Sequence, residues 1–108
     1  MEKIIQIPYI VDLDDILTED FHLDTWVEEN YELMDEIILE AAKELIADEE
    51  ATAIEILEFW LDGDVAAVLE MQRSGMKESL TNILEHWIVR EEYEKAAITR
   101  DLISSLDK

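Results

Sequence analysis

Carboxylates are the side chains of this sequence whose type and spacing could do chemistry. Between residues 24 and 48 an acid stands at every fourth position, and these seven acids are Asp24, Glu28, Glu32, Glu36, Glu40, Glu44 and Asp48. Glu29 and Asp35 lie between them, and Lys43 is the one base of the stretch. Like charges four residues apart on a helix repel each other by about 0.2–0.5 kcal/mol per pair. Because such a row attracts cations, we predict that these nine acids, named here the acidic ladder, contact a basic partner.

The sequence has no recognisable pattern of catalytic or metal-binding residues. His22 and His86 stand apart and lack the His-x-x-x-His spacing of a zinc site. Residues 62–64 (Asp-Gly-Asp) resemble the start of a calcium loop, but its further ligands are absent, so we interpret them as a helix end and the next helix cap. Residues 12–15 (Asp-Leu-Asp-Asp) are interpreted as a solvated turn. Since a Gly-rich phosphate loop and a nucleophile elbow are also missing, we predict a protein that is not an enzyme and that has neither metal nor cofactor.

The net charge of −21 is unevenly placed along the chain. Residues 1–70 hold 22 Asp and Glu and two Lys and Arg, whereas residues 71–108 hold seven acids and six bases. An acidic body is therefore followed by a nearly neutral tail. The field of the body repels nucleic acid and anionic membranes, so direct binding to either is excluded. It attracts basic proteins, of which nucleic-acid-binding proteins are the largest class.

Length and composition predict a single domain, 1–108, in the cytoplasm. The chain has 108 residues, of which 49 % are hydrophobic, and it contains no Cys. Its first residues lack the pattern of a signal peptide, and no apolar run approaches the roughly 20 residues that span a membrane. With two Gly and one Pro, the chain is poor in turn residues, which argues against a sandwich or a barrel.

The N-terminal residues predict a short extended arm or edge strand. Ile5, Ile7, Tyr9 and Val11 alternate with other residues, which is the period of a strand. Pro8 lacks a backbone donor and so favours an edge position. The sequence offers no second strand. The arm is expected to pack on its own core, with pairing to a partner or to a second copy, as a homodimer, as the alternatives.

Five helices are predicted after the arm, so the expected fold is mainly α, a compact bundle of about five helices. The first covers the acidic ladder, where Val27, Tyr31, Met34, Ile38, Ala41 and Leu45 form an apolar stripe. The others are expected at residues 50–61, 65–74, 77–89 and 92–106. Short connections between them favour antiparallel packing. Trp26, Phe59 and Trp60 are candidate binding hot spots, because Phe59 and Trp60 would point about 100° apart on a helix and at least one would reach the surface.

Residues 84–106, LEHWIVREEYEKAAITRDLISSL, resemble the UVR motif, a helical hairpin that mediates contact between excision-repair nuclease subunits. The matching residues are Leu84, Ile88, Glu91, Tyr93, Glu94, Ala96, Ala97, Arg100, Asp101, Ile103 and Leu106. The resemblance implies a protein-binding hairpin with Tyr93, Ala96, Ala97, Arg100 and Asp101 in its contact region. Trp87 replaces a small residue of the motif and Thr99 replaces a Leu, so we expect Trp87 to push the helices apart or to extend the contact. A plain helical hairpin with the same packing is the alternative.

Three explanations of the acidic ladder compete. As one helix, its 25 residues would span about 36 Å with a net charge of −8, against roughly 11 charges on one DNA strand of that length. The first explanation is therefore mimicry of nucleic acid, and the composition resembles the small acidic DNA mimics by which phages inhibit restriction or CRISPR enzymes. The second is adaptation to high salt, which the near-neutral tail disfavours. In the third, the acids keep an adaptor soluble while another face binds. We predict a nucleic-acid mimic that inhibits a basic DNA- or RNA-binding protein, with a UVR-like adaptor or assembly factor as the alternative.

Overall fold

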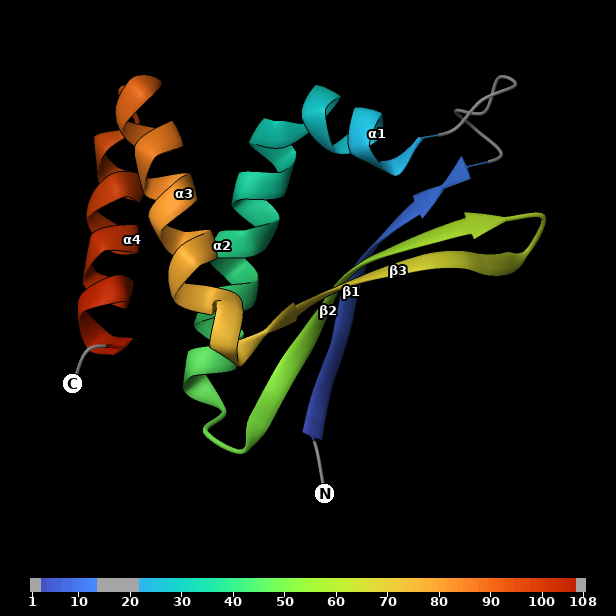
Figure 1. The fold of residues 1–108 in the computed structure, drawn as a ribbon, viewed down its shortest axis with the longest axis horizontal. Helices are drawn as coiled ribbons and strands as arrows, with labels where there is room; N and C mark the ends of the chain where they lie inside the picture. The colour runs from blue at the N-terminus through green and yellow to red at the C-terminus, as the bar shows by residue number, and fades with distance from the viewer. Residues whose placement is uncertain (1–2, 14–21, 107–108) are drawn as a thin grey trace.

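The computed structural model describes residues 3–13 and 22–106, which form an α/β fold of helices beside one sheet (Figure 1). The elements are β1 (Lys3–Asp12), α1 (Leu23–Glu29), α2 (Tyr31–Ala47), β2 (Ala51–Leu61), β3 (Asp64–Gln72), the 3-10 turn η2 (Arg73–Gly75), α3 (Met76–Val89) and α4 (Tyr93–Leu106). The prediction of a mainly α bundle of about five helices is therefore wrong. Part of the turn predicted at residues 12–15 lies outside the described residues.

The sheet of the described residues has three strands in the order β1-β2-β3. β1 runs parallel to β2, and β2 runs antiparallel to β3. A parallel pair needs a crossover connection, and α1 and α2 lie in the chain between its two strands. The N-terminal segment is thus an edge strand that pairs within its own chain, and its register shifts between Gln6 and Tyr9, around Pro8. A homodimer through the outer edge of β1 stays a prediction.

The second and third predicted helices, at residues 50–61 and 65–74, are the strands β2 and β3. Residues 62–64 form the turn between them instead of ending a helix. Asp62 and Gly63 both have positive φ, 53° and 82°, as the two central residues of a type I′ hairpin turn require. Half of the apolar residues of β2 are β-branched or aromatic, namely Ile54, Ile56, Phe59 and Trp60. Such residues favour a buried central strand, although their spacing along the sequence had suggested a helix.

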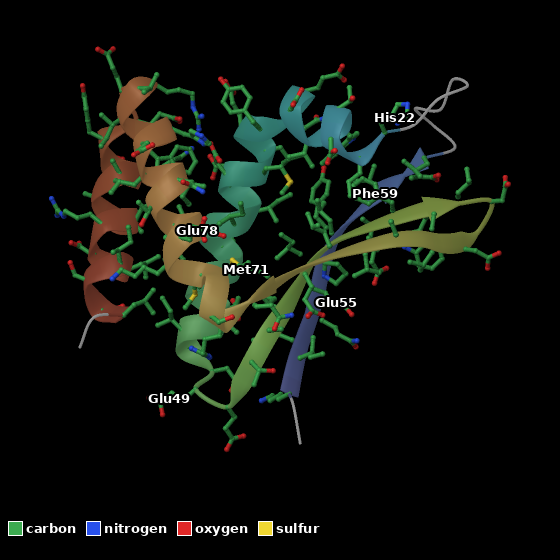
Figure 2. The ribbon with its side chains drawn as sticks, viewed as in Figure 1. His22, Glu49, Glu55, Phe59, Met71 and Glu78 are labelled. Atoms are coloured by element: carbon green, nitrogen blue, oxygen red, sulfur yellow. The ribbon has the colours of Figure 1, made fainter. Side chains whose placement is uncertain are left out.

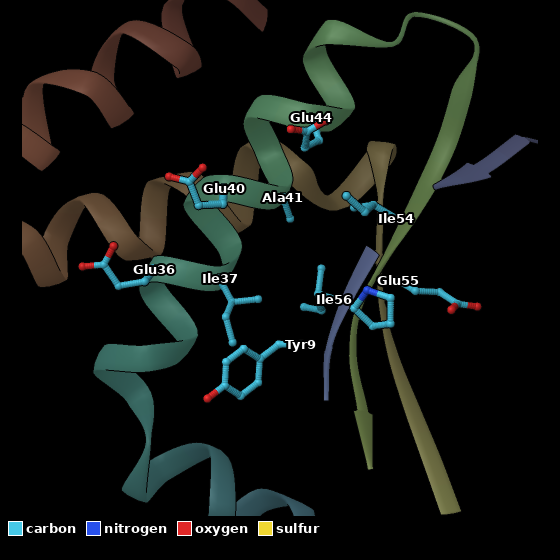
Figure 3. A pocket seen from close by; sticks show the side chains of 10 residues that line it. Tyr9, Glu36, Ile37, Glu40, Ala41, Glu44, Ile54, Glu55 and Ile56 are labelled. Carbon is cyan, nitrogen blue, oxygen red and sulfur yellow. The ribbon is translucent and has the colours of Figure 1, made fainter. Parts of the chain in front are cut away.

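A bulge in β2 brings two adjacent residues to the buried side of the sheet. Glu55 pairs with Glu70 and Leu57 pairs with Leu69, so Ile56 is the extra residue. Ile56 and Leu57 are both buried although they are adjacent in sequence. Figure 3 shows Ile54 and Ile56 pointing toward α2, whereas Glu55 points to the opposite side of the sheet. One face of the sheet therefore forms the core with the helices, and the other carries acids.

The helix predicted over the whole ladder is divided into α1 and α2 at Asn30. The side-chain amide of Asn30 donates to the carbonyl oxygen of Trp26 at 2.8 Å, and its backbone N–H donates to the same oxygen at 3.0 Å. These bonds end α1. The axis of α1 points in a different direction from that of α2, toward the sheet (Figure 1). The 36 Å rod of charge that the sequence predicted does not exist in the fold.

The guanidinium of Arg73 ends α2 and joins it to the sheet. Its Nη2 donates to the carbonyl oxygens of Leu45 and Asp48, both at 2.6 Å, and its Nε donates to that of Ala51 at 2.8 Å. Two of these carbonyls belong to the last turn and C-cap of α2, where a cation also interacts favourably with the helix dipole.

Helices α3 and α4 form the hairpin predicted near the C-terminus, and Trp87 does not push them apart. Its side chain is 1 % exposed, and its indole Nε1 donates to the Thr99 hydroxyl at 3.0 Å. The two residues that depart from the UVR pattern therefore contact each other inside the hairpin. The expectation that Trp87 would separate the helices or extend an external contact is wrong.

Candidate protein-binding site

The acids of the ladder occupy different environments along α1 and α2. Those on α1, and three of those on α2, are exposed: Asp24, Glu28, Glu29, Glu32, Glu40 and Glu44. Asp48 caps α2 and forms an ion pair of 2.6 Å with Lys3, whose hydrogen bond lowers the pKa of Asp48 below its ordinary value. Asp35 and Glu36 face the C-terminal hairpin. The ladder is thus a surface feature with one buried member, Asp35.

Asp35 is 2 % exposed and lies in the interface between α2 and the hairpin. Arg90 Nη1 donates to its Oδ2 at 3.0 Å, and His86 Nδ1 lies 3.0 Å from both carboxylate oxygens. Arg90 also stacks over the rings of Tyr31 and Trp87, with its Cζ 5.3 and 4.8 Å from their centroids. Asp35 is therefore neutralised inside the protein and does not form part of a surface that a partner contacts.

Glu36 is neutralised by the same hairpin. Lys95 of α4 forms ion pairs with Glu36 and with Glu92, the latter at 3.2 Å. The hydrogen bonds to Glu36 and Glu92 raise the pKa of Lys95, and those from Arg90 and Lys95 lower the pKa of Glu92. Bases of the tail thus compensate the side of α2 that faces the hairpin.

A groove of about 460 Å³ lies between α2 and β1, on the helix side of the sheet (Figure 3). Its apolar lining comes from both elements and from β2: Pro8, Tyr9, Ile37, Ala41, Ile54 and Ile56. Glu36, Glu40 and Glu44 form its rim along α2, and Glu55 of β2 also borders it, although its side chain points away from α2 (Figure 3). Carboxylates four residues apart follow one another at about 6 Å along a helix. The groove therefore combines an apolar floor with a row of carboxylates on one side.

Glu36 is paired with Lys95, but the other two carboxylates of the row lack a strong internal partner. Glu40 pairs with Lys43 at 3.1 Å, but both side chains are largely exposed, and such pairs contribute little. Within the described ranges, Glu32 and Glu44 take part in none of the ion pairs. This side of α2 consequently keeps a negative potential that a cationic side chain could neutralise.

The three candidate aromatic hot spots are dispersed. Phe59, labelled in Figure 2, is fully buried. It packs edge-on against Trp26, with ring centroids 5.2 Å apart. Trp26 is half-buried in that contact. Trp60 belongs to the opposite face of the sheet, where its Nε1 donates to Glu58 at 2.9 Å. The aromatic residue at the groove is Tyr9, which is 49 % exposed and which the sequence analysis did not single out. Its place in the strand alternation of the N-terminal arm was the available signal.

Three of the five UVR-like contact residues, Tyr93, Arg100 and Asp101, are exposed on the hairpin. Tyr93 is 62 % exposed, Ala96 is buried, and Arg100 pairs with the neighbouring Asp101 at 3.2 Å. A groove of about 300 Å³ is lined by Leu84, Ile88, Tyr93, Ala96, Ala97 and Arg100. This second groove is apolar and has a single cationic residue at its edge.

The fold and the two grooves define an α/β protein with candidate surfaces for macromolecular contact. Across the described residues, no group of three or more His, Cys, Asp or Glu side chains is arranged to hold a metal ion. No helix among them has the length and apolar character needed to cross a membrane. Comparison with protein-family models, with curated proteins and with solved structures found no match to this chain.

Proposed function

We propose that this protein is not an enzyme and that it binds a basic surface of a nucleic-acid-binding protein, from which it displaces the nucleic acid. The observation that supports this proposal is the pair of exposed carboxylates Glu40 and Glu44 beside the apolar groove between α2 and β1. The carboxylates would bind Lys or Arg side chains, and the groove would receive an apolar side chain next to them. Charge gives such a contact its rate and the groove gives it selectivity.

In this proposal the protein imitates the local spacing of phosphates in nucleic acid, and not a single long rod of charge. Along α2 the row has one carboxylate per about 6 Å, against one phosphate per 3.4 Å on a DNA strand. The exposed acids of α1 add charge beyond the bend at Asn30. Composition favours an inhibitor of a restriction or CRISPR enzyme, of the type that phages encode, acting in the cytoplasm.

The test compares two double variants of equal charge. Glu40→Gln with Glu44→Gln removes two acids from the groove rim, and Glu85→Gln with Glu94→Gln removes two exposed acids from the hairpin. Each immobilised protein captures partners from the native host's lysate, which are then eluted with a salt gradient or with duplex DNA.

We expect a basic protein that elutes steeply with salt, that DNA displaces, and that the groove variant retains much less than the hairpin variant does. Addition of the protein should then release DNA from the purified partner. Capture that persists in concentrated salt, or that both variants retain equally, would contradict the proposal.

A UVR-like adaptor or assembly factor is the second candidate. It is supported by the apolar groove of the hairpin, next to which Ile88, Val89 and Tyr93 are exposed. In that case Tyr93→Ala or Arg100→Ala should abolish capture, while Glu40→Gln with Glu44→Gln has no effect. The reverse pattern favours the nucleic-acid mimic.

A further inference from the structure

One face of the sheet is left uncovered by the helices. The helices gather on one side of the strands (Figure 1). Glu55 points away from them (Figure 3). The strand register places Ile10 and Val68 on the same face as Glu58, and they are 59 % and 46 % exposed. This uncovered face therefore presents exposed apolar side chains on both outer strands, β1 and β3.

The uncovered face is also acidic. Its rows of paired residues contain Asp12, Glu55, Glu58 and Glu70 and no Lys or Arg. Glu55 stands directly opposite Glu70 on neighbouring strands, where like charges destabilise a sheet. The amide groups of Gln6 and Gln72 donate to these two carboxylates. Packing against the helices does not explain this unfavourable pair of acids, because the helices lie on the other face of the sheet.

The dimensions of the face suit a helix. Three strands about 4.8 Å apart span about 10 Å, which is close to the diameter of an α-helix with its side chains. A helix laid along the strands could cover Ile10, Val68 and Trp60 with an apolar stripe. Lysines or arginines flanking that stripe would meet Glu55 and Glu70. A sheet with helices on both faces is a common three-layer arrangement.

Electrostatic repulsion argues against a second copy of the chain as the partner that covers this face. Two copies face to face would oppose their acids without any base between them, and each copy carries a net charge of −21. We propose that the uncovered face of the sheet binds a cationic amphipathic helix of a partner protein. This surface lies on the other side of the sheet from the groove between α2 and β1, and the inference does not depend on the proposed function.

The probe is a synthetic helix of about 18 residues, or five turns, with Leu on one side and Lys on the other. A peptide of the same composition in scrambled order is its control. The indole N–H signal of Trp60 and the backbone amide signals of Ile10 and Val68 report on the uncovered face in NMR titrations. Two variants of equal charge are compared, Glu55→Gln with Glu70→Gln on this face and Glu40→Gln with Glu44→Gln on α2.

We expect the amphipathic peptide to shift the signals of the uncovered face and to bind more tightly than the scrambled peptide. The substitution of Glu55 and Glu70 should weaken its binding about fivefold or more, and that of Glu40 and Glu44 less than about twofold. Val68→Ser should weaken it as well, because it removes apolar contact without disturbing the core. Equal effects of the two double variants, signal changes confined to α1 and α2, or self-association of the free protein through Ile10 and Val68 would overturn the inference.

Discussion

The buried pair of Asp35 and Arg90 gives the sharpest test of how the hairpin is attached to α2. The perturbation is a cycle of three variants, Asp35→Leu, Arg90→Met and the double variant, which replace charged side chains by apolar ones of similar size. The Asp35 side chain is 3 % exposed and that of Arg90 is 15 % exposed, with 3.0 Å between Nη1 and Oδ2. Removing one partner of a buried pair leaves the other charge without compensation.

The two single variants should differ in cost, because the remaining charges differ in their surroundings. After Asp35→Leu, Arg90 keeps its bond to Glu92 at 3.0 Å, so we expect a loss of about 2 kcal/mol. After Arg90→Met, the more deeply buried Asp35 keeps only its contact with His86, and we expect about 3 kcal/mol. The double variant should lose only about 2 kcal/mol, which corresponds to a coupling energy of about 3 kcal/mol.

The assay is unfolding in urea, with the free energy of unfolding extrapolated to water. The exposed pair Arg100 and Asp101, 3.2 Å apart and more than half exposed, provides a control with the same changes of charge. Its cycle should give a coupling energy below about 0.5 kcal/mol. If Asp35 and Arg90 show the same small coupling, or if the double variant loses the sum of the singles, the interface does not depend on this pair and the reasoning is refuted.

Four further predictions address other parts of the fold. Trp87→Phe should cost about 2 kcal/mol in urea unfolding, and Thr99→Val should add little in that background, since both remove the same buried hydrogen bond. Gly63→Ala should cost about 1 kcal/mol with an unchanged circular-dichroism spectrum, because φ is 82° but nothing lies within 4 Å of the added methyl group. Hydrogen bonds from Arg90 and Lys95 lower the pKa of Glu92 in the folded protein, so they stabilise the fold at pH values above its ordinary pKa of 4.5. This stabilisation is lost as the pH falls through the pKa of Glu92 in the folded protein. The Glu92→Gln variant should therefore have a lower melting temperature than the wild type at neutral pH and the same melting temperature in acid. Moderate salt should raise the melting temperature by screening the net charge of −21, and a flat or falling response would contradict this.

The limits of prediction from sequence are clearest at residues 50–72. Glu, Leu and Ala in this region favour a helix locally, and the spacing of Ile54, Leu57 and Leu61 fits a helical face. The bulge at Ile56 explains that spacing, because it brings two adjacent residues to one face and so breaks the alternation of a strand. The dipeptide Asp62-Gly63 was nevertheless a recognisable hairpin signal, and its interpretation as a helix cap concealed both strands.

Other features needed the tertiary structure. The hairpin of α3 and α4 follows from local periodicity and was predicted from the sequence. The bond between Trp87 and Thr99, and the pairing of Asp35 with Arg90, join residues whose contact depends on how the helices meet. Sequence spacing along a single helix carries no information about such partners. The groove between α2 and β1 was missed for the same reason, because it requires the parallel pairing of β1 with β2.

The placement of the bases, more than the number of acids, determines which surfaces are acidic. Arg90 and Lys95 belong to the nearly neutral tail in sequence, yet in space they neutralise Asp35 and Glu36 of the acidic body. Arg73 is held by backbone carbonyls at the end of α2. Within the described residues, Glu44 at the groove rim and Glu55, Glu58 and Glu70 on the uncovered sheet face take part in none of the ion pairs. Acids that served solubility in general would need no such division, whereas a protein that presents two anionic surfaces beside apolar ones requires its own cations to be used elsewhere.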